Sequence, residues 1–164
     1  MQEDYREVLD KFYETKIKEV MEKRLWNLPI LEQDTEIKDV IASLRDKHHV
    51  WIVDVDSEKL VGVITEKDVL GILAHPKEFG YKPSPKATPS LYHGTAGDAE
   101  SVMIKKVVTC NPESTIKDVI TTMTKYNVRR LPVIDENRKI VGGVTLMDLI
   151  NRFMSIVYWH GKRV

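Results

Sequence analysis

The sequence predicts an α+β protein made of two pseudo-symmetric β-α-β-β-α units packed sheet to sheet, with one extra helix at the N-terminus. Two observations lead to this prediction. The string IKDVI occurs at residues 37–41 and again at residues 116–120, and the segments that follow it repeat in the same order. Within each copy, apolar residues first recur with helical spacing and then gather in short runs typical of strands. Repetition of this kind indicates a fold assembled from similar units.

The repeat extends well beyond the shared pentapeptide. The first copy reads VWIVDVDSEKLVGVITEKDVL at residues 50–70, and the second reads RLPVIDENRKIVGGVTLMDLI at residues 130–150. Asp54 then corresponds to Asp135. A single unit of this size would leave one face of its sheet uncovered, so packing two units against each other is the expected way to bury both faces.

Each copy begins its common part with an amphipathic helix. The apolar positions fall at i, i+3, i+4 and i+7, which marks one buried helix face. They are Ile37, Val40, Ile41 and Leu44 in the first copy, and Ile116, Val119, Ile120 and Met123 in the second. Residues with N-capping side chains precede both helices. We expect Asp34 or Thr35 to cap the first, and Ser114 or Thr115 to cap the second.

Two strands and a second helix follow in each copy. The predicted strands cover residues 50–55 and 60–64 in the first copy, and 131–134 and 139–144 in the second, with polar turns at 56–59 and 135–138. The second helix begins near Asp68 or Asp148, and a further short strand is expected ahead of each first helix.

The chain divides into four parts on this basis. Residues 1–16 form an N-terminal helix whose apolar stripe docks on the pair or on a partner chain. Residues 17–74 and 101–164 are the two repeat units. Residues 75–100 hold four of the seven prolines and three of the eight glycines, which predicts a long surface loop between them.

Composition excludes several classes of protein. The 164 residues include 25 basic and 25 acidic side chains and one cysteine, Cys110. A single thiol cannot form an internal disulfide, and it favours a reducing compartment. Balanced charge argues against a protein that coats nucleic acid. The longest apolar runs are too short to cross a membrane, and the acidic N-terminus does not read as a signal peptide, so we expect the cytoplasm.

The second copy resembles a CBS domain, the module named after cystathionine beta-synthase. Its matching phrases are TCNPESTIKDVI, NVRRLPVID and GGVTLMDLI. The first copy is a more divergent version, in which VWIVD replaces RRLPVID. The whole chain therefore resembles a stand-alone tandem CBS pair, also called a Bateman module. The resemblance implies a regulatory module that binds AMP, ADP, ATP or S-adenosylmethionine between its paired sheets and that forms homodimers.

Both copies carry the same polar residues at the start of the last helix. A helix start offers unpaired backbone N–H groups and a partial positive potential, so it accepts a phosphate. An Asp there can accept hydrogen bonds from a ribose diol, although Thr and Asp at this place also serve simply as helix caps. The resemblance assigns the aspartates to ribose and the threonines to phosphate. The candidate ligand residues are Ile64, Thr65 and Asp68 in the first copy, and Val144, Thr145 and Asp148 in the second.

The two copies differ around this junction. Arg129 and Arg130 precede the strand of the second copy and suit bidentate phosphate binding, although surface arginines are also common. His48 and His49, weaker phosphate partners, take their place in the first copy. The resemblance puts Thr109 on the adenine side and Pro132 against the base, where the first copy has Ile30 and Trp51. We therefore favour the site centred on Asp148 over the one centred on Asp68.

The rest of the sequence shows no pattern typical of a metal-binding or catalytic site. The histidines show no metal-ligand spacing, Cys110 has no evident base beside it, and no catalytic motif is visible. We expect neither a catalytic site nor a metal or cofactor. We expect an adenosine ligand, and an unidentified effector protein as partner. The alternative is a constitutive interaction scaffold with vestigial nucleotide sites, which would use the N-terminal stripe or residues 75–100. Binding to nucleic acid is a poorly supported third hypothesis.

Overall fold

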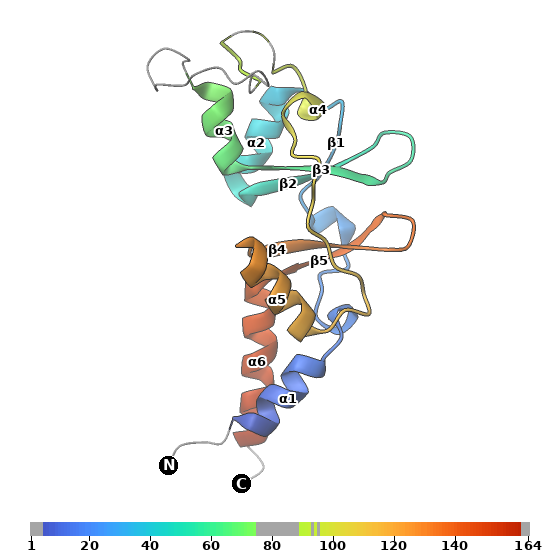
Figure 1. Cartoon of the computed structure of the whole chain (residues 1–164), viewed down its shortest axis with the longest axis vertical. Helices are drawn as coiled ribbons and strands as arrows, with labels where there is room; N and C mark the ends of the chain where they lie inside the picture. The colour runs from blue at the N-terminus through green and yellow to red at the C-terminus, as the bar shows by residue number, and fades with distance from the viewer. Residues whose placement is uncertain (1–4, 75–88, 93, 95, 162–164) are drawn as a thin grey trace. The chain divides into compact units, whose positions relative to one another are not determined.

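The computed structural model describes residues 5–74, 89–92, 94 and 96–161 (Figure 1). The chain forms two compact units. Unit 1 comprises Met1–Leu28 and Val108–Val164, and unit 2 comprises Pro29–Val107. The predicted α+β class is confirmed, since each unit combines a small sheet with helices. No helix in the described part of the chain is long and apolar enough to span a membrane.

Unit 2 contains a three-stranded sheet in the order β1-β2-β3. The β1 and β2 strands pair in parallel, and β2 and β3 pair antiparallel as a hairpin. Helices α2 and α3 lie on one face of this sheet (Figure 1), where Val50, Ile52 and Ile64 meet Val40 and Ile72 in a buried cluster. The elements are β1 Ile30–Glu32, α2 Ile37–Lys47, β2 His49–Val53, β3 Leu60–Thr65, α3 Glu66–Leu73 and α4 Ala99–Val102.

Unit 1 contains the β4-β5 hairpin and three longer helices. Its buried cluster joins Ile116 and Val119 of α5 to Leu131, Val133 and Val144 of the hairpin. The elements are α1 Arg6–Glu14, η1 Ile17–Glu19, η2 Leu25–Asn27, α5 Ile116–Tyr126, β4 Arg130–Ile134, β5 Ile140–Thr145 and α6 Leu146–Gly161, where η denotes a short 3-10 helix. The predicted helices of both copies are therefore present, and the hairpin strands lie within two residues of the expected ends.

The N-terminal helix packs on its own chain. Phe12 is buried in the core of unit 1, and its ring meets Phe153 of α6 edge to face at a centroid distance of 5.5 Å. Val8 of α1 is also buried. Of the two docking partners expected for the apolar stripe of α1, the structure shows the pair itself.

The segment after α1 runs along the second copy of the repeat, not the first. The Ile116 amide donates to the Thr15 carbonyl at 2.9 Å, and the Gly143 amide donates to the Glu22 carbonyl at 3.0 Å. Between these bonds, Ile17 is completely buried. Residues 15–22, which we call the first crossing segment, therefore belong to unit 1.

A second crossing segment, residues 97–104, makes the equivalent contacts in unit 2. The Ile37 amide donates to the Gly97 carbonyl at 3.1 Å, and the Ile104 amide donates to the Val63 carbonyl at 2.9 Å. The two sequence repeats thus exchange their opening segments. This exchange makes the compact units differ in composition from the ranges 17–74 and 101–164 of the repeat.

One predicted helix cap, that of α2, is wrong. Neither Asp34 nor Thr35 caps α2, because the N-cap residue is Glu36 and its side chain makes no capping bond. The Ile37 amide donates to the Gly97 carbonyl of the second crossing segment, just as the Ile116 amide of α5 donates to the Thr15 carbonyl. In the second copy the prediction is confirmed, since Thr115 caps α5 and accepts a hydrogen bond from the Asp118 amide.

The short strand expected ahead of α5 is reduced to a single bridge, between Cys110 and Val133. Two prolines explain this difference. In unit 2 the Trp51 amide donates to the Pro29 carbonyl, and the Gln33 amide donates to the Val53 carbonyl. The residues of unit 1 that correspond to Trp51 and Gln33 are Pro132 and Pro112. Proline has no amide hydrogen, so neither of these two bonds can form in unit 1.

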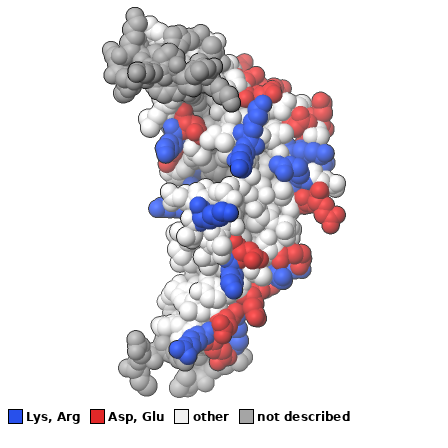
Figure 2. All heavy atoms as spheres, viewed as in Figure 1, with Lys and Arg blue, Asp and Glu red and all other residues white. Residues whose placement is uncertain are grey.

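The predicted loop at residues 75–100 is only partly described, since residues 75–88 lie outside the described residues. Its final part is not a surface loop. Ala96 and Ala99 are buried in the core of unit 2, and α4 begins at Ala99. Small side chains allow this close packing of a segment that glycines and prolines marked as irregular. On the face drawn in Figure 2, basic and acidic side chains are interspersed, in keeping with the balanced formal charge.

Candidate ligand site

Each unit has a junction at which a strand passes directly into a helix. In unit 1, β5 ends at Thr145 and α6 begins at the next residue. The Leu146 amide, at the start of this helix, donates to the Arg129 carbonyl at 2.9 Å. This bond fixes the residue that precedes β4 beside the helix start. The equivalent bond in unit 2 joins the Glu66 amide to the His48 carbonyl at 3.0 Å.

The aspartate of the unit 1 junction takes part in a capping box. Asp148 Oδ2 accepts hydrogen bonds from the Thr145 amide at 2.7 Å and from the Thr145 hydroxyl at 2.8 Å, and the Asp148 amide donates to Thr145 Oγ1 at 3.2 Å. The capping role that Thr and Asp can play here is therefore real. It uses one carboxylate oxygen. In the described part of the chain no hydrogen bond uses Oδ1, which can therefore accept one from a ligand hydroxyl.

The same arrangement occurs at the unit 2 junction. Asp68 Oδ2 accepts from the Thr65 amide at 2.8 Å and from the Thr65 hydroxyl at 2.9 Å. In both units the threonine hydroxyl hydrogen points to the aspartate of its own chain. A threonine that donated to a phosphate would have to turn its hydroxyl away from this carboxylate first.

Two arginines lie beside the unit 1 junction. Arg130 pairs with Thr145 across the β4-β5 hairpin and is half-buried, while Arg129 is exposed. Among the described residues, no ion pair uses either guanidinium group. Both positive charges are thus available to an anionic ligand at the start of α6.

The unit 2 junction has a different charge environment. His48 Nδ1 lies 2.8 Å from Glu66 Oε2, so the carboxylate of the first residue of α3 engages the residue that stands in the place of Arg129. His49, in the place of Arg130, packs its ring against Trp51 at a centroid distance of 4.9 Å. Trp51 itself is buried, with 3% of its surface exposed. Glu66 is not among the residues predicted from the sequence, although it directly follows Thr65.

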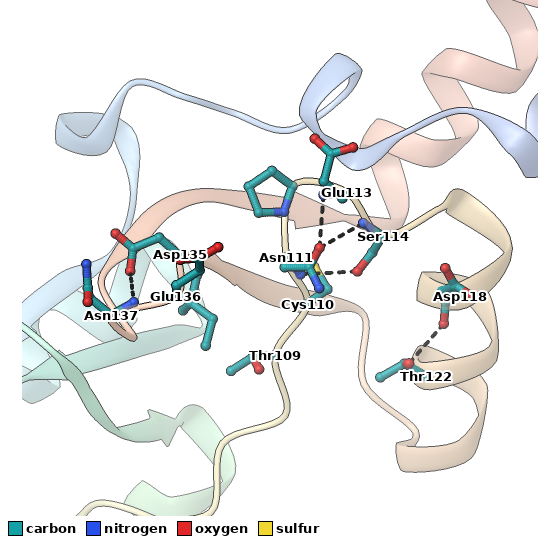
Figure 3. A pocket seen from close by; sticks show the side chains of 12 residues that line it. Thr109, Cys110, Asn111, Glu113, Ser114, Asp118, Thr122, Asp135, Glu136 and Asn137 are labelled. Carbon is teal, nitrogen blue, oxygen red and sulfur yellow. Dashed lines mark hydrogen bonds between the residues drawn. The ribbon is translucent and has the colours of Figure 1, made fainter.

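Thr109 lines a pocket of about 910 Å³ whose lining includes neither the arginines nor the junction residues (Figure 3). The pocket is at the Ile134 end of β4, whereas Arg130 begins that strand. It therefore brings Thr109 together with none of the other predicted ligand residues. Its lining residues are Thr109, Cys110, Asn111, Pro112, Glu113, Ser114, Asp118, Thr122, Ile134, Asp135, Glu136 and Asn137.

The other predicted residues form the body of the hairpins. Pro132, Val144 and Ile64 are buried, and Val144 and Ile64 contribute to the cores of their units. Cys110 lines the pocket with its thiol largely buried, and this burial raises the pKa of the thiol to about 12. A thiol with such a pKa stays protonated near neutral pH and is a poor nucleophile.

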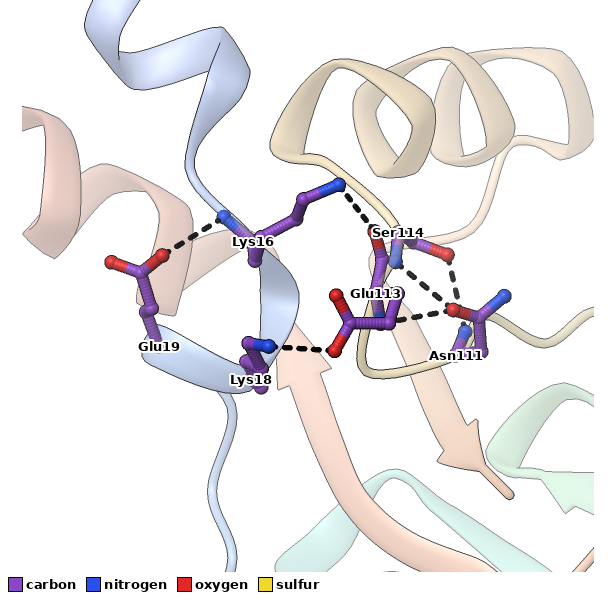
Figure 4. A network of polar contacts seen from close by, with 6 residues as sticks. All are labelled: Lys16, Lys18, Glu19, Asn111, Glu113 and Ser114. Carbon is purple, nitrogen blue, oxygen red and sulfur yellow. Dashed lines mark hydrogen bonds and ion pairs between the residues drawn. The ribbon is translucent and has the colours of Figure 1, made fainter. Parts of the chain in front are cut away.

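The rim of the pocket is held by the first crossing segment (Figure 4). Lys18 Nζ lies 2.6 Å from Glu113 Oε1, and Lys16 Nζ donates to the Glu113 carbonyl at 3.0 Å. The hydrogen bond from Lys18 lowers the pKa of the Glu113 carboxyl. Asn111 Oδ1 accepts from the Glu113 and Ser114 amides. Despite the acidic rim, no group of three potential metal ligands occurs among the residues that the structure describes.

Comparison with known proteins decides the family. The CBS domain model matches residues 17–75 and 99–155, which together make up most of the chain. The chain belongs to the CBS domain family. The two matches make it a tandem CBS pair, and they include the junction residues of both units.

Two curated relatives show the range of proteins that contain similar CBS pairs. The uncharacterized protein MJ1426 of Methanocaldococcus jannaschii is 31% identical over 152 residues, and the alignment covers 82% of this chain and 88% of that protein. The SNF1-related protein kinase regulatory subunit gamma-1-like of Arabidopsis thaliana is 28% identical over 130 residues, covering 76% of this chain but 29% of that protein.

Solved structures of CBS pairs share the fold. The CBS domain pair of protein MJ0100, in complex with 5′-methylthioadenosine and S-adenosyl-L-methionine, is 27% identical with a TM-score of 0.61, over 85% of this chain and 99% of that one. CBSX2 in complex with AMP is 19% identical with a TM-score of 0.69, over 86% and 97% of the two chains.

Proposed function

We propose that this CBS pair is a regulatory module that binds an adenosine-containing ligand, either AMP, ADP or ATP, or S-adenosylmethionine, and reports its presence to a partner protein. The observation that carries the proposal is the unit 1 junction. There Asp148 keeps one carboxylate oxygen available beside the N-terminus of a 16-residue helix, and two arginines without ion-pair partners in the described structure flank it. The adenosine ligands of the MJ0100 pair and of CBSX2 support this assignment.

We propose a chemical role for each residue of the junction. Asp148 Oδ1 accepts from a ribose hydroxyl, and Arg129 and Arg130 bind phosphate oxygens at the start of α6. Thr145 contributes its backbone and, after reorientation, its hydroxyl. Thr109 contacts the base, and Pro132 and Val144, which are buried, form the part of the hairpin that supports this contact. The corresponding set in unit 2 is Ile64, Thr65, Asp68, His48 and His49.

Calorimetric titration of the full chain with AMP, ATP and S-adenosylmethionine tests the proposal. Asp148→Ala should weaken binding by roughly ten- to a hundredfold, because a hydrogen bond to a charged group typically contributes about 1.5–3 kcal/mol. Asp118→Ala is the matched control. Asp118 forms the same capping box with Thr115 at the start of α5, with bonds of 2.9 and 2.8 Å, but has no assigned ligand contact. Equal losses in both variants would show that Asp148 acts through helix capping alone.

Regulation requires that the ligand bind two states of the pair with different affinities. We propose an unidentified effector protein as the reader of this change, and a homodimer as the functional assembly. Several large apolar side chains of α6 are exposed, among them Met147, Ile150 and Tyr158, and a monomer rarely leaves such a stripe uncovered. The scaffold hypothesis is weakened, because Val8 and Phe12 of the N-terminal stripe are buried within unit 1.

A further inference from the structure

The two junctions differ most in the residue that begins the last helix. Leu146 occupies this position in unit 1 and Glu66 in unit 2. Unit 1 therefore places two arginines and one aspartate around the helix start. Unit 2 places two carboxylates there, those of Glu66 and Asp68, and one of them binds the His48 ring.

We propose that Glu66 sets the ligand specificity of unit 2, so that this junction disfavours a phosphorylated adenosine and accepts an adenosine whose 5′ substituent is positively charged. The inference rests on the proposed function, since it assumes that Asp68 binds the ribose of such a ligand. It assigns the two junctions of one chain to ligands of opposite charge.

The N-terminus of α3 carries a negative charge of its own. The backbone amides at a helix start stabilise an anion, and in unit 2 the Glu66 carboxylate lies at the first position of α3. A phosphate at the same place would meet this carboxylate at close range. Two like charges about 5 Å apart in a largely aqueous setting repel enough to change an affinity by roughly three- to tenfold.

Among the described residues, the groups around the unit 2 junction do not match the arginines that we propose as phosphate ligands in unit 1. His48 directs Nδ1 to Glu66 Oε2, and the His49 ring contacts the indole of Trp51. Lys67 is exposed and adds one positive charge in the first turn of α3. It offsets part of the charge of the two carboxylates, which are one residue away on either side.

The test weakens the unit 1 site of the full chain by means of Asp148→Ala, so that binding to unit 2 can be resolved. Calorimetry then compares AMP, 5′-methylthioadenosine and S-adenosylmethionine with and without Glu66→Gln, which removes the charge and keeps the shape. The added substitution should raise the affinity for AMP by about three- to tenfold and lower that for S-adenosylmethionine by a similar factor. The affinity for the uncharged 5′-methylthioadenosine should stay the same.

Two further variants serve as controls. Glu58→Gln removes a negative charge from the turn before β3, and β3 separates this turn from Glu66 by six residues, about 17–20 Å. At ordinary ionic strength a charge at that distance is screened, so the three affinities should not change. Glu66→Leu copies unit 1 at this position and should reproduce the effect of Glu66→Gln, and thermal unfolding checks that each variant folds.

The outcomes separate the inference from the proposed function. An unchanged ratio of AMP to S-adenosylmethionine affinity in both Glu66 variants would overturn the inference alone. Loss of all binding in Asp148→Ala, with binding intact in the wild type, would also overturn it, because unit 2 would then hold no adenosine ligand. A wild-type chain that binds none of the three compounds would overturn the proposed function, and the inference with it.

Discussion

At the residue scale, two glycines mark the places where the crossing segments approach the sheets. A Cβ atom on Gly142 would lie 2.8 Å from Met21 Sδ and 2.9 Å from the Glu22 carbonyl oxygen. A Cβ atom on Gly62 would lie 2.9 Å from Met103 Cβ. Neither glycine has a positive φ, so close approach, not backbone conformation, requires the absence of a side chain.

We predict that Gly142→Ala lowers the free energy of unfolding by about 1–3 kcal/mol, the usual range for overpacking. The Glu22 carbonyl belongs to the backbone, so its clash with the new methyl group cannot be relieved by a rotamer change. Urea denaturation measures the effect. Gly97→Ala is the matched control, because a Cβ atom there has no neighbour within 4 Å. Similar stabilities of the two variants would contradict the close-packing argument.

At the scale of elements, the missing strand of unit 1 follows from two proline positions, and this can be reversed. Pro112→Gln restores the residue type that unit 2 has at position 33. The new amide should donate to the Ile134 carbonyl, as the Gln33 amide donates to the Val53 carbonyl at 2.9 Å. Hydrogen exchange should show the amide of residue 112 protected to the same order as that of Gln33. Exchange at the rate of an exposed loop would mean that the prolines are not the cause.

Elements defined by periodicity were predictable, and those defined by distant partners were not. The apolar spacing from Ile37 and Ile116 identified α2 and α5, because a buried helix face depends on local sequence. The hydrogen bond of the first amide of α2 could not be predicted locally, since its acceptor, the Gly97 carbonyl, lies 60 positions away in the chain. The helix α4 could not be predicted locally either. It is short, and the sequence around it resembles that of a loop.

Some residues of the candidate site were predictable from the sequence, and others were not. Thr145 and Asp148 stand out because their spacing repeats that of Thr65 and Asp68, and the structure places them at equivalent junctions. The pairing of His48 with Glu66 was not anticipated, because it joins residues on either side of the β2-β3 hairpin. Only the hairpin register brings these side chains within 2.8 Å.

At the scale of the whole molecule, the sequence repeat and the compact units divide the chain at different places. Unit 2 is continuous from Pro29 to Val107, but unit 1 needs both ends of the chain. We predict that a fragment of residues 29–107 unfolds cooperatively, while fragments 1–88 and 89–164 do not. Fragment 1–88 lacks the second crossing segment with the buried Ala99, and fragment 89–164 lacks the first crossing segment with the buried Ile17.

Circular dichroism during thermal unfolding measures this cooperativity. Mixing fragments 1–88 and 89–164 should restore a cooperative transition, because each supplies the segment that the other lacks. A sharp transition of fragment 1–88 alone would show that the exchanged segments are dispensable. The 29–107 fragment controls for the general effect of shortening the chain.

The exchange of segments also orders events during synthesis. A ribosome completes unit 2 once Val107 has emerged, yet α1 and the first crossing segment have no partner until α5, β4, β5 and α6 follow. At about 5–20 residues per second, this delay lasts roughly 3–10 seconds. For that time Val8, Phe12 and Ile17 are exposed on the nascent chain, as an apolar stretch that a ribosome-associated chaperone could bind. The time for which this stretch stays exposed is therefore set by the rate at which the ribosome translates residues 108–164.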